Sequence, residues 1–233
     1  MGATVEEAID YKMLIDKISD TFDRRYQDDA ACHVRIVGLV FASPNSRLAK
    51  EEIIPRINEW HCRSGEHIDF YFAGYTNPYG HPPVDGYQEV KIPGRNEQWF
   101  YSDTLFSKFR HEFQSLTTWK YGGNEELLLI NAHFDSDSKK ARLDFGSMMC
   151  CRLDVMKNDR TILNVGEFFE SVFKFAENSI NDTNPTYTFS NKQGIGIACS
   201  ALKRFLLSHL PKGLDADYRR AEHLAVRDFA RRK

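Results

Sequence analysis

The sequence predicts an α/β protein in which a mixed sheet is flanked by helices. Two nearly continuous apolar runs, residues 33–42 and 67–74, are typical of parallel strands that are covered on both faces. A helical pattern between them, at 47–62, would form the crossover that parallel pairing requires. Two later apolar runs, 125–134 and 141–156, are joined by a polar turn and predict an antiparallel hairpin in the same sheet.

The composition is that of a folded, water-soluble domain. The chain has 233 residues, of which 42% are hydrophobic and 27% charged, and its net charge is −2. These values exclude a disordered chain and a chain that is basic throughout, and the length fits a single α/β domain over 1–233. No run approaches the roughly 18 apolar residues of a membrane span, the polar N-terminal stretch lacks a signal-peptide pattern, and the five cysteines form no C-x-x-C pair. We therefore expect a cytoplasmic protein with no membrane partner.

The helices follow from apolar positions at helical spacing. Residues 5–28 predict an amphipathic N-terminal helix, and 47–62 predict the crossover helix, in which Pro55 should cause a kink. The segment 101–117 predicts a helix that opens on a Ser/Asp cap. The segment 165–180 predicts a strongly apolar helix that follows the hairpin.

Two further helices are expected at the C-terminus, over 196–210 and 214–232, so that 194–233 would form a helical appendage. Basic residues outnumber acidic ones over 203–233, although the whole chain carries a small negative charge. A basic amphipathic helix contacts acidic partners or nucleic acid, or simply presents a solvated face.

The resulting order is helix, β-α-β, helix, β-β-α, and two closing helices. This order is similar to that of thioredoxin-like folds over about residues 33–180. Where that fold carries its redox C-x-x-C motif, at the start of the first crossover helix, this chain has Ser43-Pro44-Asn45-Ser46. The resemblance therefore implies the topology without thiol–disulfide chemistry.

A long connection at 75–99 is predicted to be irregular, because it contains four prolines and three glycines. Loops of this length are usually functional, partner-binding or disordered. Ligands in open α/β sheets gather beyond the carboxyl ends of the parallel strands. The candidate ligand-binding residues at that edge are Ser43, Asn45 and Arg47 after the first strand, and Asn77, Tyr79 and His81, close to Tyr75, after the second. The first group could hold an anion at free helix N–H groups, or Ser43 or Asn45 could simply cap the helix.

An acidic residue in the second strand gives a different candidate. Alternation places Ile68, Phe70 and Phe72 on one face of this strand and Asp69 on the other. Asp69 followed by the sequence Glu89-Val90-Lys91 resembles the metal-binding pattern of PD-(D/E)xK nucleases. The resemblance implies that Asp69 and Glu89 would hold Mg²⁺ and that Lys91 would orient the attacking water or stabilise charge on the phosphate. A salt-bridged loop explains the same residues without catalysis.

Our leading hypothesis from the sequence is an accessory, non-catalytic subunit that binds a protein partner in a cytoplasmic assembly. The 75–99 loop and the C-terminal helix would be its contact surfaces, and the basic helix could also contact nucleic acid. Two alternatives stay open: a Mg²⁺-dependent nuclease of the PD-(D/E)xK type, and a nucleotide-binding enzyme or sensor with its site at the strand carboxyl ends. Mg²⁺ is expected as a cofactor only for the nuclease.

Overall fold

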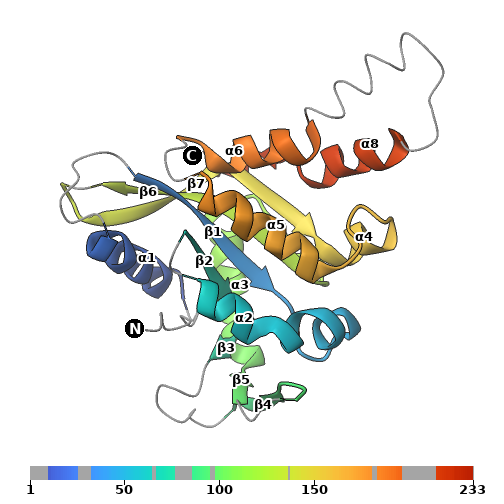
Figure 1. Ribbon diagram of the computed structural model, residues 1–233. Helices are drawn as coiled ribbons and strands as arrows, with labels where there is room; N and C mark the ends of the chain where they lie inside the picture. The colour runs from blue at the N-terminus through green and yellow to red at the C-terminus, as the bar shows by residue number, and fades with distance from the viewer. Residues whose placement is uncertain are drawn as a thin grey trace.

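A computed structural model of the protein describes residues 10–25, 33–64, 67–76, 86–94, 98–135, 137–179, 183–195 and 214–232. Its centre is a mixed five-stranded sheet with the order β2-β1-β6-β7-β8, and a second sheet has the order β3-β5-β4 (Figure 1). Helices flank the larger sheet, so the predicted α/β class with a mixed sheet is confirmed.

The strand pairing follows the predicted order of elements. Strand β1 (His33–Phe41) runs parallel to β2 (Ile68–Phe72) and antiparallel to β6 (Glu126–Asp135). Strands β6 and β7 (Lys140–Arg152) form the expected hairpin, and β8 (Val226–Arg227) adds a short edge. The order β2-β1-β6-β7 agrees with the thioredoxin-like topology that the order of elements suggested.

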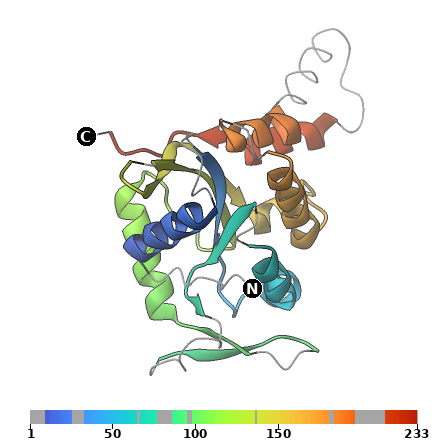
Figure 2. The same ribbon diagram turned by 60° about the vertical axis from the view of Figure 1, so that its left-hand side comes forward.

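Helices cover both faces of this sheet (Figure 2). On one face lie α1 (Tyr11–Arg25) and α3 (Asp103–Leu116), and on the other lie α2 (Ile57–Arg63) and α5 (Val165–Glu177). The remaining helical segments are η1 (Ala49–Ile53), η2 (Ile54–Arg56), α4 (Leu153–Asn158), α6 (Pro185–Ser190), η3 (Asn191–Ile195) and α8 (Leu214–His223).

Aromatic side chains fill both layers of the core. On the α3 side, Phe41 at the end of β1 is fully buried and contacts the rings of Phe106, Phe109, Phe113, Trp119 and Tyr121. On the other side, Trp60 of α2 stacks on Phe72, and Phe70 packs against Phe169 and Phe173 of α5. The alternation predicted for β2 is therefore correct: Phe70 and Phe72 face the layer that contains α2 and α5, and Asp69, which pairs with Arg35, faces the opposite layer.

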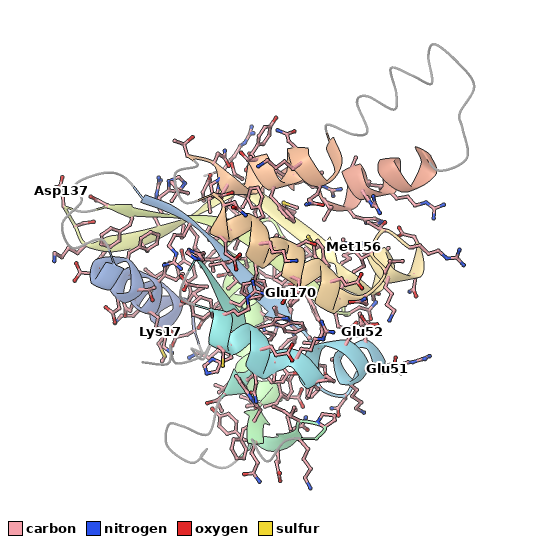
Figure 3. The ribbon with its side chains drawn as sticks, in the orientation of Figure 1. Lys17, Glu51, Glu52, Asp137, Met156 and Glu170 are labelled. Carbon is pink, nitrogen blue, oxygen red and sulfur yellow. The ribbon has the colours of Figure 1, made fainter. Side chains whose placement is uncertain are left out.

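The crossover from β1 to β2 changes helix type at the predicted proline. It starts as the π-helical turn η1, passes through the 3₁₀ turn η2, which contains Pro55, and ends as the α-helix α2. Charged contacts hold the crossover against α5: Glu52 of η1 accepts a hydrogen bond from the backbone N–H of Val165 at 2.7 Å and also pairs with Lys157. At the other end, Arg63 pairs with Glu170 of α5. Figure 3 shows Glu170 and, from the other end of the crossover, Glu52.

The segment 75–99 contains regular structure, which corrects the prediction of an irregular loop. Within it, β3 (Tyr75–Thr76), β4 (Gln88–Lys91) and β5 (Gln98–Tyr101, ending just beyond it) form the three-stranded sheet. Strands of two to four residues give almost no periodic signal, and the prolines and glycines around them favour a loop assignment. The small sheet lies beyond the carboxyl ends of β1 and β2 (Figures 1 and 2). It is anchored on α2 through Trp99, whose Nε1 donates to Oδ1 of Asn58 at 2.5 Å.

Regular structure also differs from the predictions after the hairpin and at the C-terminus. Strand β7 ends at Arg152, so the last part of the predicted strand 141–156 belongs to α4. The helix predicted over 214–232 ends at His223, because the chain then joins the sheet as β8. Residues 194–233 are therefore not simply a helical appendage. The helix predicted over 196–210 lies outside the described residues.

The arginines near the C-terminus bind backbone carbonyls of the same chain. Arg219 donates to the carbonyl of Asp159 at 3.1 Å, and Arg220 to that of Thr161 at 3.4 Å. Arg231 donates to the carbonyl of Thr117 just after the end of α3, at 3.2 Å. These contacts tie the terminal segment to the body of the domain, so this basic segment is not only a solvated face. In the part of the chain that the structure describes, no helix has the length and apolar character needed to cross a membrane.

Candidate functional site

The three residues of the nuclease-like pattern lie in two different sheets. Asp69 is buried in β2 of the large sheet, where its Oδ1 lies 3.5 Å from Nη2 of the buried Arg35 in β1. Glu89 and Lys91 are exposed on β4 of the small sheet, and Glu89 accepts a hydrogen bond from the Gln98 side chain at 3.1 Å. The structure therefore does not bring Asp69 together with Glu89 and Lys91 as one metal-binding group. Elsewhere in the described ranges, no group of three or more His, Cys, Asp or Glu side chains is arranged to hold a metal ion.

The turn after β1 is organised by its own hydrogen bonds. The Ser46 side chain accepts from the backbone N–H of Ala49 at 3.1 Å, so Ser46 caps the crossover rather than Ser43 or Asn45. The Ser43 hydroxyl accepts from the Asn45 N–H at 3.4 Å within the turn. Arg47 points away into solvent, with a side-chain exposure of 88%, and pairs with Glu51 one turn later. The other candidate ligand residues, Asn77, Tyr79 and His81, lie outside the described residues.

A group of buried tyrosines lies next to this turn, beyond the carboxyl end of β1. Tyr75 of β3 and Tyr101 of β5 are 2% and 1% exposed, and their ring centroids are 4.9 Å apart. The chain reaches this position because β2 turns sharply at Gly74, whose φ is +79°, and a Cβ there would lie 2.8 Å from Cβ of Phe106. Only glycine adopts this backbone conformation and tolerates this contact without strain.

Tyr121 and two acidic residues extend the group. The ring of Phe106 lies 6.0 Å from that of Tyr101 and 5.7 Å from that of Tyr121, so it connects the tyrosines. Glu125 is 5% exposed and directly precedes β6, which begins beside the carboxyl end of β1. Burial and, to a smaller extent, the nearby carboxylates of Glu125 and Glu126 together raise the pKa of Tyr121 to about 12.

Glu126, the first residue of β6, is hydrogen-bonded to the segment that precedes this strand. Its carboxylate is fully buried and accepts hydrogen bonds from Nε1 of Trp119 and from the backbone N–H of Gly122, both at 2.9 Å. Burial raises the pKa of Glu126, while these two donors and the nearby Arg152 oppose the increase. Cys150 lies 3.6 Å from the same carboxylate, and burial raises the pKa of its thiol to about 12, so the thiol stays protonated at neutral pH.

The sequence placed Tyr75 at the carboxyl edge of the parallel strands. It did not identify the other residues of this region, namely Tyr101, Tyr121, Glu125 and Glu126. These residues come from two strands and from the loop before β6, and their convergence depends on the small sheet, which the sequence did not predict. The available signal was the acidic pair Glu125-Glu126, which opens a buried apolar run.

The outer edge of the small sheet is a second candidate site. The backbone N–H of Ser102 donates to the carbonyl of Gly74 at 2.9 Å, one residue beyond the Tyr75–Tyr101 pair of β3 and β5. In an antiparallel ladder this bond means that Tyr75 and Tyr101 form a non-hydrogen-bonded pair. The backbone N–H and C=O of Tyr101 therefore point away from β3, towards β4.

The orientation of the Tyr101 backbone groups determines which backbone groups of β4 point towards β5. Tyr101 is opposite Gln88, so the backbone groups of Gln88 and, two residues on, of Val90 point towards β5. Those of Glu89 and Lys91 point the other way, to the outer edge of β4. None of the described strands pairs with that edge.

Comparison with models of known protein families, with curated proteins and with solved structures finds no significant match. The functional argument therefore rests on the two candidate sites themselves.

Proposed function

We propose that the protein is a partner-binding subunit of a protein assembly and that it holds an extended segment of its partner along the outer edge of β4. The supporting observation is the orientation of the Glu89 and Lys91 backbone groups, which leaves two N–H and two C=O groups at an edge that no described strand covers. An added strand satisfies such groups by continuing the sheet.

The shape of the small sheet favours this mode of binding. Its strands lie at one end of the molecule, where β4 is the strand farthest from the large sheet (Figure 1). Val90 faces inward and is buried, whereas Gln88, Glu89 and Lys91 are exposed. Charged side chains on an edge strand discourage unspecific pairing, and they select a partner segment with complementary charges beside Glu89 and Lys91.

The binding edge can be removed without disturbing the sheet. Replacing Glu89 by proline deletes an outward N–H, whereas the bonds from β4 to β5 come from Gln88 and Val90 and are retained. Glu89→Ala is the matched control, because it removes the same side chain and keeps the N–H. Its only described loss is the exposed hydrogen bond to Gln98.

The experiment is a pull-down from the native host with the full-length chain and both variants, together with melting curves of each. We expect wild type and Glu89→Ala to retain the same stoichiometric protein partner and Glu89→Pro to lose it, with no large change in melting temperature. Retention of that partner by a folded Glu89→Pro variant would contradict strand addition. Recovery of wild type without any stoichiometric partner would contradict the proposed function itself.

A further inference from the structure

The outer edge of β4 is complementary to itself in charge. Its two outward-pointing residues, Glu89 and Lys91, carry opposite charges and lie on either side of Val90. When two copies of this strand run antiparallel with Val90 opposite Val90, Glu89 of each copy lies opposite Lys91 of the other. Registers centred on Glu89 or on Lys91 instead place like charges directly opposite each other, which destabilises a sheet. Charge therefore selects the register centred on Val90.

The backbone groups of β4 fit the same register. The N–H and C=O groups of Glu89 and Lys91 point to the outer edge, as the ladder of β3, β5 and β4 requires. In an antiparallel pair, opposite residues whose backbone groups face each other exchange both hydrogen bonds. Glu89 therefore bonds to Lys91 of the second copy, and Lys91 bonds to its Glu89, so that the outward groups of both edges are satisfied.

The side chains match on both faces of the joined strands. Opposite residues in a ladder point to the same face, so each Glu89 meets a Lys91 on the exposed face. Oε1 of Glu89 accepts a hydrogen bond from Gln98, and the second carboxylate oxygen can accept one from the lysine. On the inner face the two Val90 side chains become neighbours, and Val90 is already buried opposite Trp99 of β5.

The small size of the contact predicts a weak association. Strand β4 has four residues, and two such strands bury much less than the roughly 1,200 Å² of stable complexes. Because β4 is the strand of the small sheet farthest from the large sheet, the large sheets of the two copies would lie at opposite ends of the joined small sheets (Figure 1). We therefore expect a dimer that dissociates on dilution.

We propose that the outer edge of β4 pairs with the same edge of a second copy of this chain, antiparallel and centred on Val90. The inference rests on the proposed function, because it uses the same edge, and it names the occupant of that edge when no other segment is bound. A partner segment and a second copy cannot occupy the edge together. Self-pairing therefore limits partner binding as the concentration of the protein rises.

The test is sedimentation equilibrium of the full-length protein between about 10 µM and about 1 mM, a range that covers weak association. We expect a reversible equilibrium, with monomer at the low end and dimer at the high end. The assembly should stop at the dimer, because a two-fold contact uses the same edge of both copies. A chain that stays monomeric throughout, or one that grows beyond a dimer, would overturn the proposal.

Charge reversals test the register. Glu89→Lys places like charges opposite each other at both contacts, and so does Lys91→Glu, so each variant alone should dimerise at least about tenfold more weakly than wild type. An equimolar mixture of the two variants should dimerise again, because each contact between them joins opposite charges. Asp137→Lys, a charge reversal at an exposed position between β6 and β7, is the control and should dimerise as wild type does. Unchanged affinity in both single variants, or a mixture that stays monomeric, would refute the register.

The pull-down with Glu89→Pro separates this inference from the proposed function. If wild type stays monomeric at the highest concentration while Glu89→Pro loses the host partner, self-pairing is wrong and the proposed function stands. If the charge reversals weaken the dimer as expected while a folded Glu89→Pro variant keeps the host partner, self-pairing stands and strand addition by that partner is wrong.

Discussion

The hydrogen bonds of the Glu126 carboxylate can be tested through the stability of the protein. Replacing Glu126 by alanine leaves the indole N–H of Trp119, which is 1% exposed, without its acceptor. An unsatisfied buried donor costs about 1–3 kcal/mol, and loss of the γ-methylene adds about 0.8 kcal/mol. Removal of a buried negative charge offsets part of this loss, so we expect Glu126→Ala to lower the free energy of unfolding by about 2–3 kcal/mol.

Glu126→Gln separates the hydrogen bonds from the charge. The amide carbonyl still accepts from Trp119, and the Gly122 N–H is at an exposed residue and can bond to water, so the expected loss is only about 0.5–1.5 kcal/mol. Urea unfolding at pH 7 measures both differences, with an unchanged dependence on urea concentration showing that the same surface is exposed on unfolding. The reasoning is refuted if Glu126→Ala is as stable as wild type, or if glutamine destabilises as much as alanine.

Three further outcomes follow from the structure. Burial lowers the pKa of His61 to about 4, from about 6.5 in the unfolded chain. The buried neutral imidazole therefore contributes its full stability above pH 6.5, and this contribution is lost as the pH falls towards 4. After allowance for partial exposure, this amounts to about 1–2 kcal/mol in urea titrations across that range, and His61→Gln should remove the slope. Gly38→Ala should destabilise the fold by about 1–3 kcal/mol in the same assay, because the new Cβ would lie 2.9 Å from the ring of Phe70. A maleimide reagent followed by peptide mapping should modify the exposed Cys62 in the native protein and leave the buried Cys151 unmodified; native-state labelling of Cys151 at the same rate as Cys62 would contradict its described burial.

The large sheet could be predicted because its signals are local and strong. A run of β-branched residues specifies β1, and apolar alternation specifies β2. The polar turn between β6 and β7 specifies their hairpin. Each of these signals lies within a short stretch of the chain. The cap of α3 is equally local, since Ser102 accepts from the N–H of Leu105 as expected. Pro55 predicted the break in the crossover correctly, although not the π-helical turn that precedes it.

The small sheet and the group of tyrosines beside it could not be predicted, because they depend on long-range contacts. Strands β3 and β4 pair only through β5, which follows them in the sequence, and none of the three is long enough to show a period. Glu125 and Tyr75 are fifty residues apart in the sequence, and only the turn at Gly74 brings Tyr75 to the end of β1. The same reason explains β8, whose two residues pair with Met148 and Met149 of a distant strand.

Amide hydrogen exchange of β4 tests the proposed binding edge most directly. In the free protein, we expect the amides of Gln88 and Val90 to be protected by β5 and those of Glu89 and Lys91 to exchange rapidly. On addition of the partner recovered by the pull-down, the account predicts that Glu89 and Lys91 become protected while the other two amides do not change. Rapid exchange of Glu89 and Lys91 in the saturated complex would contradict binding by strand addition.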